Sequence, residues 1–166
     1  MNTGTAVLEK DIWELLESVM DPEVPVISII DLGVVREINY KDEHCHIKIT
    51  PTYSGCPAMQ VIEDDICSTL KENGIDNISI ETVLSPAWTT DWLSENAREK
   101  LKAYGIAPPE KNSVDKNALF AKPKKIQCPQ CQSHNTKMVS QFGSTACKAL
   151  YRCEDCLEPF DYFKCI

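Results

Sequence analysis

The stretch I-T-P-T-Y-S-G-C-P-A-M, residues Ile49 to Met59, joins a predicted strand to a predicted helix. The alternating run from His44 to Thr50 leads into it and is typical of a strand, and Ser54-Gly55 indicates a turn. Pro57 suits the first position of a helix, because its missing N–H has no helical partner to lose. The pattern therefore predicts Cys56 at the N-cap of a helix.

Cys56 is the first candidate functional residue. Free N–H groups and the positive end of the helix dipole favour a thiolate at a helix N-terminus, so we expect its pKa to lie below that of an ordinary thiol. A thiolate is a nucleophile and a soft metal ligand. The alternative is a small apolar side chain that closes the junction, because free cysteine is often buried.

Hydrophobic periodicity extends this unit in both directions. Helical spacing from Val7 to Val19 predicts a first helix that ends at Asp21-Pro22. The remaining predictions are strands at 26–30, 34–40, 44–51 and 78–84 and helices at 57–70 and 91–104. The expected fold class is α+β, with a small mixed α/β domain over residues 1–106.

Two polar clusters in this domain have more than one interpretation. The carboxylates of Asp21 and Glu23 could act as acid, base or hard metal ligands, or they could only cap a rigid turn. His44 and His46 point to one face of a strand, where they could bind a metal or form a solvated surface. Trp88 and Trp92, four residues apart, could anchor the third predicted helix or form a partner-binding patch.

Length and composition limit the classes of protein. The 166 residues suffice for one ordinary domain and a small module. No run of about 20 apolar residues is present, and the first ten residues do not resemble a secretory signal. We therefore expect a cytoplasmic protein without a membrane partner. In that compartment nine cysteines favour metal ligands or working thiols over disulfides.

The charge is distributed unevenly. Residues 1–121 carry 10 Lys/Arg and 21 Asp/Glu, whereas residues 122–166 carry 7 Lys/Arg and 4 Asp/Glu. Because phosphate contacts need a basic surface, the acidic body argues against nucleic acid as the main partner. It is compatible with protein partners.

A polar, proline-containing linker is predicted over residues 107–125, followed by a cysteine-rich module over 126–166. Two C-x-x-C pairs, separated by 21 residues, place four thiols at the ends of short predicted strands: Cys128, Cys131, Cys153 and Cys156. Four thiolates in a tetrahedron form the preferred structural zinc site, although iron also accepts this arrangement. About 40 residues build too small a core alone, so we expect a zinc-ribbon-like module whose folding needs the metal.

Cys147 and Cys165 remain in the module. If the strands 148–152 and 159–165 pair with Arg152 opposite Phe160, the same register makes these two cysteines direct neighbours. Such a pair could form a second, labile thiol site or could be two buried small side chains.

The combined motifs resemble the SufT-like domain of iron–sulfur assembly factors. The segments that carry the resemblance are D-P-E at 21–23, I-D-L-G at 30–33 and the stretch from Thr50 to Pro57. The resemblance implies that Cys56 is the functional thiol. It also singles out a set of accompanying motif residues, namely Asp21, Glu23, Asp31 and Thr52.

Adding P-A-W-T-T-D-W, G-I-A-P-P and the cysteine-rich tail extends the resemblance to the accessory proteins of the phenylacetyl-CoA epoxidase system. This implies a non-enzymatic maturation factor in aerobic phenylacetate catabolism. Its clients would be the iron–sulfur reductase or the di-iron oxygenase subunits, and iron or an iron–sulfur cluster could be held transiently.

Two other classes of function stay open. A thiol-dependent enzyme could use Cys56 as a nucleophile, although the sequence identifies no histidine–acid pair as its base. A nucleic-acid-binding zinc ribbon is the other alternative, with only the weakly basic tail in its favour.

Overall fold

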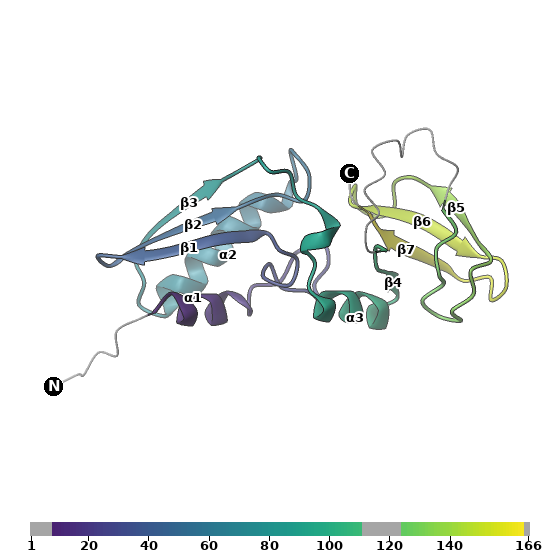
Figure 1. Ribbon diagram of the computed structural model, residues 1–166, viewed down its shortest axis with the longest axis horizontal. Coiled ribbons are helices and arrows are strands. Elements are labelled where there is room, and N and C mark those ends of the chain that lie inside the picture. Colours follow the sequence, from purple (N-terminus) through teal and green to yellow (C-terminus); the bar gives the residue numbers. More distant parts are fainter. Residues whose placement is uncertain (1–7, 111–123, 165–166) are drawn as a thin grey trace. The chain divides into compact units, whose positions relative to one another are not determined.

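A computed structural model of the chain describes residues 8–110 and 124–164. It divides into two compact units, Met1–Trp88 and Thr89–Ile166 (Figure 1). This boundary lies earlier than the end of the domain expected over residues 1–106. The third helix and the first residue of the predicted linker belong to the second unit.

The first unit is a three-stranded sheet with two helices. Its sheet has the order β1-β2-β3, in which β1 and β2 are antiparallel and β2 and β3 are parallel. The crossover between the parallel strands is α2 (Figure 1). The elements are α1 (Glu9–Leu16), β1 (Val35–Lys41), β2 (His44–Ile49), α2 (Ala58–Glu72) and β3 (Asn77–Thr82).

Alternation along β2 places one face of this sheet in the core. Cys45, Ile47 and Ile49 are buried, and they lie between less buried neighbours. The helices present apolar faces to the same core, with Ile12 and Leu16 from α1 and Ala58, Ile62, Ile66 and Leu70 from α2. The fold class predicted from the sequence, α+β, is confirmed.

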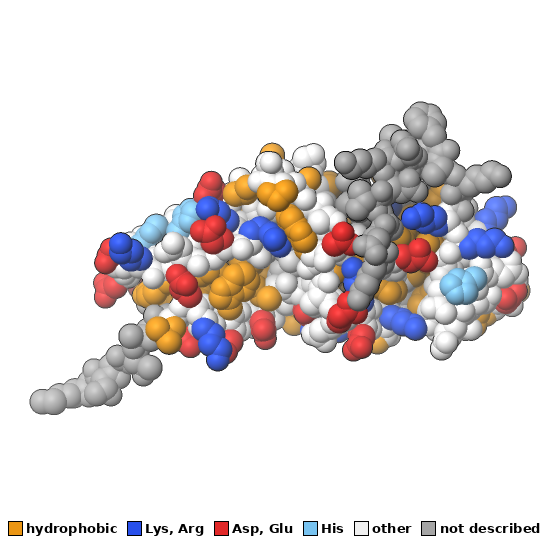
Figure 2. Space-filling view, in the orientation of Figure 1, with side chains coloured by type: hydrophobic (Ala, Val, Ile, Leu, Met, Phe, Trp, Pro, Cys, Tyr) orange, Lys and Arg blue, Asp and Glu red, His pale blue; other side chains and the backbone are white. Residues whose placement is uncertain are grey.

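The opposite face of the sheet is polar. Lys48 lies 3.0 Å from Glu37, and His46 lies 3.3 Å from Glu81. Figure 2 shows acidic and basic side chains interspersed over the end of this unit that carries the β1–β2 turn. His44 and His46 are absent from the four-cysteine group, the one set of three or more metal-ligating residues found close together in residues 8–110 and 124–164.

Two predictions in the segment before β1 are wrong. The helix ends at Leu16, ahead of the Asp21-Pro22 step, and residues 26–30 form turns in place of a strand. Ile27 and Ile29 are fully buried, but the backbone there makes only an isolated bridge between Met20 and Ser28. A short apolar run indicates burial and does not by itself distinguish a strand from a packed turn.

The second unit is a four-stranded sheet of order β4-β7-β6-β5, preceded by a helix. Ser94 divides the predicted helix over 91–104, because its Oγ accepts the Ala97 N–H at 2.9 Å and caps a new helix. Gly105 ends that helix with φ of 92°. The elements are η1 (Thr90–Trp92), α3 (Glu95–Tyr104), β4 (Ile106–Ala107), β5 (Thr136–Ser140), β6 (Lys148–Cys153) and β7 (Pro159–Phe163).

The β6–β7 register differs by one residue from the prediction. Arg152 pairs with Pro159 in place of Phe160, because the Cys153 N–H donates to the Glu158 carbonyl and closes the turn one residue earlier. A slip of one residue exchanges the partners of every side chain along the hairpin. The backbone of Cys147 accordingly bonds to Lys164, with a distance of 2.9 Å from the Lys164 nitrogen to the Cys147 oxygen. The register that would pair Cys147 with Cys165 is therefore wrong, and Cys165 itself lies outside the described residues.

Trp88 packs within the first unit. Its side chain is buried, and its Nε1–H donates to the Leu32 carbonyl oxygen at 3.0 Å. This tryptophan therefore holds the end of the first unit against the turn that precedes β1.

Across residues 8–110 and 124–164, no helix combines the length and apolar character needed to span a membrane.

Candidate functional site

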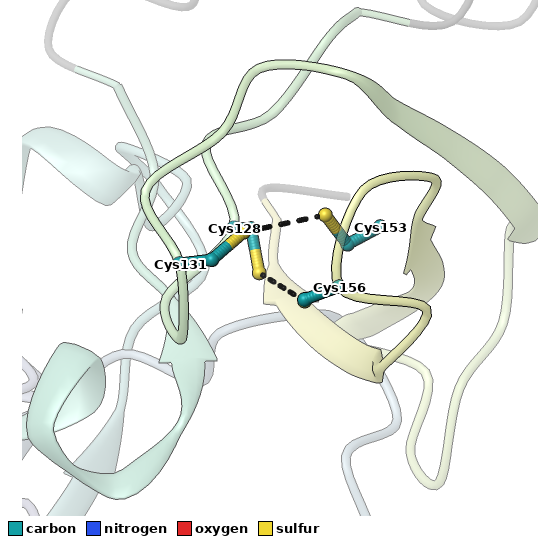
Figure 3. Close-up of side chains that lie close together, drawn as sticks. All are labelled: Cys128, Cys131, Cys153 and Cys156. Atoms are coloured by element: carbon teal, nitrogen blue, oxygen red, sulfur yellow. Dashed lines mark hydrogen bonds between the residues drawn. The ribbon is translucent and has the colours of Figure 1, made fainter.

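Four thiols converge in the second unit. Cys128 and Cys131 lie in the turn before β5, whereas Cys153 ends β6 and Cys156 lies in the turn that leads to β7 (Figure 3). Their sulfur atoms all lie within 4.8 Å of one another. The four cysteines predicted as metal ligands are thus brought together by two separate turns.

The spacing of the sulfurs fits a tetrahedral metal site. Cys128 Sγ lies 3.7 Å from Cys156 Sγ, and Cys131 Sγ lies 3.5 Å from Cys153 Sγ. With a Zn–S bond of about 2.3 Å, the edge of a regular tetrahedron is about 3.8 Å. A disulfide requires a distance of about 2.05 Å, so the sulfurs are spaced as metal ligands. The donor set is that of a structural zinc site, whose four positions are all filled by protein.

Backbone N–H groups support the thiolate form of Cys153. The N–H groups of Cys156 and Asp155 donate to Cys153 Sγ, and the hydrogen bond from Cys156 is the leading cause that lowers the Cys153 pKa to about 7. A zinc ligand must be deprotonated, so these N–H donors favour metal binding at neutral pH.

A layer of polar contacts ties the two turns together behind the sulfurs. Asp155 accepts hydrogen bonds from the Ser133 hydroxyl and from Asn135 Nδ2, the latter at 2.7 Å. The Glu154 N–H donates to the Asn135 carbonyl at 2.8 Å. These hydrogen bonds therefore tie the two turns to each other beside the four sulfurs. His134 lies in the same turn region but is exposed and outside the four-cysteine group.

The second candidate site is the loop between β2 and α2. The Cys56 N–H donates to the Tyr53 carbonyl at 3.3 Å, and Gly55 has φ of 82°, a conformation that glycine adopts without strain. The helix begins at Ala58 with Pro57 as its N-cap residue, one position after the predicted cap. Cys56 nevertheless stays at the helix entrance, where its sulfur accepts a hydrogen bond from the Ala58 N–H.

The electrostatics of Cys56 differ from the prediction. Burial raises the pKa of its thiol, and the nearby carboxylates of Glu23 and Asp21 raise that pKa further. Hydrogen bonds from the Ala58 N–H and the Tyr53 side chain lower the pKa but do not outweigh burial. The prediction that the Cys56 pKa lies below the ordinary thiol value is therefore wrong. It took into account the position of Cys56 at a helix N-terminus but not its burial or the carboxylates of the neighbouring turn.

The Asp21-Pro22-Glu23 turn is part of the same neighbourhood. Asp21 is buried, and its Oδ1 accepts the N–H groups of Glu23 at 2.8 Å and Val24 at 2.7 Å. The carboxylate thus fixes the turn, as the structural interpretation of this motif requires. Both acidic residues also act electrostatically on Cys56, so the turn and the thiol form one site.

Asp31 and Thr52 lie in adjoining backbone segments. The Asp31 N–H donates to Ser28 Oγ at 3.0 Å, and both Asp31 and Thr52 are half-buried. The Thr50 N–H donates to the Val34 carbonyl at 2.8 Å, which fixes the start of the loop beside the turn that contains Asp31. Whether their side chains serve the thiol stays a prediction.

Sequence reasoning missed Tyr53 as part of this site. It lies three positions before Cys56, a spacing at which a turn returns the chain, and Ser54-Gly55 indicated such a turn. Only the folded loop reveals that the aromatic side chain reaches the thiol.

Comparison with protein families gives two matches. Residues 9–82 match the iron–sulfur cluster assembly protein family, and residues 112–164 match the PaaD zinc beta ribbon domain. Together with the two described units, these matches define a class of protein in which an iron–sulfur assembly domain is joined to a zinc ribbon.

Relatives narrow this class. The chain is 49% identical over 156 residues to an Escherichia coli K12 protein named as a component of 1,2-phenylacetyl-CoA epoxidase, covering 94% of this chain and 92% of that protein. The chain therefore belongs to the PaaD family of phenylacetyl-CoA epoxidase proteins.

The first unit also has separate relatives. The chain is 38% identical over 82 residues to the Fe–S protein maturation auxiliary factor SufT of Staphylococcus aureus, covering 48% of this chain and 92% of that protein. A solved structure from Bacillus anthracis, described as a domain of unknown function DUF59, is 29% identical with a TM-score of 0.53 and covers 56% of this chain and 90% of its own. These comparisons agree on the SufT-like fold predicted from the motifs.

Proposed function

We propose that this protein is a non-enzymatic accessory factor that matures the iron-containing components of a multicomponent phenylacetyl-CoA epoxidase. The observation that carries the proposal is the joining of two parts in one chain: an assembly-factor unit with a thiol at the β2–α2 junction, and a PaaD-type ribbon. The named relatives point the same way, since one carries the name of an epoxidase component and others are named Fe–S maturation auxiliary factors.

In this proposal Cys56 is the thiol that holds iron or a cluster as cargo. Its pKa is raised, so at neutral pH binding of iron must displace a proton from the sulfur. That cost weakens the complex relative to one formed by a ready thiolate. Glu23 and Asp21 would favour the incoming cation and thereby offset part of the cost. Weak, proton-coupled binding suits a factor that passes its cargo on.

The ribbon unit has a structural part in this proposal. Cys128, Cys131, Cys153 and Cys156 would hold one metal ion, which we assign as zinc because all four ligands are thiolates in a closed tetrahedral set. Zinc there would stabilise the fold and take no part in transfer. The clients are the reductase or oxygenase subunits of the epoxidase, and the protein acts with them in the cytoplasm.

The experiment is to produce the epoxidase subunits anaerobically with and without this protein and to measure the iron content of each purified subunit. We expect at least one subunit to lose most of its iron when the protein is absent. Epoxidase that carries full iron and runs at full rate without it would exclude the maturation role.

A further inference from the structure

The four thiols of the metal site differ sharply in exposure. Cys128 and Cys153 are fully buried and Cys156 is partly buried, whereas Cys131 is exposed to solvent. A dissolved reagent can therefore reach the site most readily through Cys131. Zinc-bound thiolates keep nucleophilic character, and susceptibility to oxidation follows thiolate character and exposure.

The exposed thiol has a nearby partner in the other turn. Cys131 Sγ lies 3.5 Å from Cys153 Sγ, and the second close contact, between Cys128 and Cys156 at 3.7 Å, also joins the two turns (Figure 3). Both of these short distances therefore run between the turns. Because the Cys131–Cys153 distance is the shorter of the two, a disulfide between these two cysteines needs little movement of the sulfurs.

We propose that this metal centre is a peroxide-sensitive switch in which Cys131 is the site of oxidation and Cys153 the resolving thiol. The inference rests on the assignment of a metal to these four cysteines. It is independent of the role proposed for Cys56.

The reaction balances with hydrogen peroxide or an organic hydroperoxide as oxidant. The Cys131 sulfur attacks the peroxide oxygen, which gives a sulfenic acid and, after uptake of one proton, one water or, from an organic hydroperoxide, one alcohol. Cys153 then attacks the Cys131 sulfur, forms the disulfide and displaces hydroxide, which takes up a proton and leaves as water. Two thiolates lose two electrons in total, and the peroxide gains them. Only Cys128 and Cys156 would then remain to hold the metal, which would weaken its binding.

Loss of the metal would act on the whole ribbon. The buried sulfurs of Cys128 and Cys153 belong to the core of this unit, alongside Tyr151 and Phe160. A core of this size depends on its metal. Oxidation of the exposed Cys131 would therefore loosen the sheet of the ribbon unit. Peroxide would thereby unfold the ribbon unit while the first unit stays folded.

The test uses the full-length, zinc-loaded protein with hydrogen peroxide, a colorimetric zinc chelator and a sulfenic-acid trap. At substoichiometric peroxide we expect the trap to label Cys131 at least about tenfold more than the two buried ligands. Without the trap, non-reducing peptide mapping should find the disulfide between Cys131 and Cys153, formed in step with zinc release. A first disulfide within either C-x-x-C pair, or zinc release without label on Cys131, would overturn the proposal. A protein that contains no zinc at the start would instead contradict the metal assignment.

Replacing Cys131 with another zinc ligand tests the role of the exposed thiol while the metal stays bound. Cys131→His keeps a Cys3His set, which is a common structural zinc site, and removes the exposed thiol. We expect zinc release by peroxide to slow at least about tenfold in this variant. Cys147→Ser is the matched control, because Cys147 is a buried thiol in the same unit but outside the four-cysteine group; release from it should match the wild type. If Cys131→His binds no zinc, non-reducing peptide mapping of the wild-type protein alone decides whether Cys131 and Cys153 form the first disulfide.

Discussion

At the scale of single residues, the surroundings of Cys56 decide what this thiol can do. Burial and the carboxylates of Glu23 and Asp21 oppose its ionisation, while the Ala58 N–H and the Tyr53 side chain favour it. Because its pKa is raised, the thiol is mostly protonated at neutral pH, and its reactivity should rise steadily as the pH increases toward that pKa.

Tyr53→Phe tests the part of Tyr53 in this balance. Loss of the hydroxyl removes a donor to the thiolate, so the Cys56 pKa should rise further and alkylation at a fixed pH near 8 should slow about twofold to tenfold. The measurement is the rate of alkylation of Cys56 against pH, followed by mass spectrometry. Tyr40→Phe, half-buried on β1, is the control. An unchanged pH profile in Tyr53→Phe would contradict a direct action of Tyr53 on the thiol.

The sequence predicted which residue types mark the site but could not predict the balance of forces on Cys56. The turn at Ser54-Gly55 and the proline after the cysteine correctly placed the thiol at the entrance of α2. The sign of its pKa shift depends on burial and on the Asp21–Glu23 turn, which lies more than 30 positions earlier in the chain. Contacts of this kind, between segments far apart in the chain, produce no local sequence pattern from which they could be predicted.

At the scale of elements, α2 contributes four buried side chains to the core and begins two residues after the candidate thiol. Ile66 is fully buried on this helix, whereas Val61 on the same helix is 47% exposed. We expect Ile66→Ala to lower the free energy of unfolding of the first unit by about 2–5 kcal/mol, because it leaves a cavity in the core. Val61→Ala should change it by less than about 0.5 kcal/mol. Chemical denaturation followed in the first unit measures both, and equal effects of the two variants would contradict the assigned faces of α2.

The two turns of the metal site make a second prediction at this scale. Hydrogen bonds from Ser133, and after it Asn135, hold the pKa of the Asp155 carboxyl below its usual range. This stabilisation is present above the ordinary carboxyl pKa and is lost as the pH falls through the lowered one. Asp155→Ala should therefore speed the transfer of zinc to a chelator at pH 7. Glu154→Ala, which changes an exposed neighbour, should not. Identical rates of zinc transfer in the two variants would show that Asp155 does not stabilise the metal site.

Periodicity located the regular elements well and the turns poorly. Alternation predicted β1, β2 and β3, and helical spacing predicted α2; burial follows the same period along β2 and α2. The segment 26–30 was mistaken for a strand because its side chains are buried inside turns, which have no period. The β6–β7 register depends on one backbone bond from Cys153 to Glu158, a detail of turn length that hydrophobic pattern does not specify. The four-cysteine cluster, in contrast, could be predicted because ligand spacing is written directly into the sequence.

At the scale of the whole molecule, the two units should depend on metal differently. The ribbon has a small core that includes two of its own metal-binding cysteines, whereas the first unit has a helix-covered sheet built from aliphatic side chains. Chelation of zinc should therefore leave β1–β3 protected from hydrogen exchange and expose the amides of β5–β7. Lowering the pH should act in the same direction, since zinc leaves as its thiolates take up protons. Continued protection of β5–β7 in metal-free protein would contradict a structural role for the metal.

In the proposed function, Cys56 passes iron or a cluster to an epoxidase subunit. The most direct measurement is the iron content of the epoxidase subunits purified after anaerobic production with wild-type protein, with Cys56→Ser, and with Cys67→Ser, which removes another partly buried thiol on α2. Serine preserves the shape of the site, so both variants should fold with the thermal stability of the wild type, but a hydroxyl is a poor iron ligand at neutral pH. We predict that Cys67→Ser supports wild-type iron loading and that Cys56→Ser leaves the client subunit as poor in iron as omission of the protein. Full loading of every subunit by a folded Cys56→Ser variant would show that Cys56 does not hold the iron that is passed on.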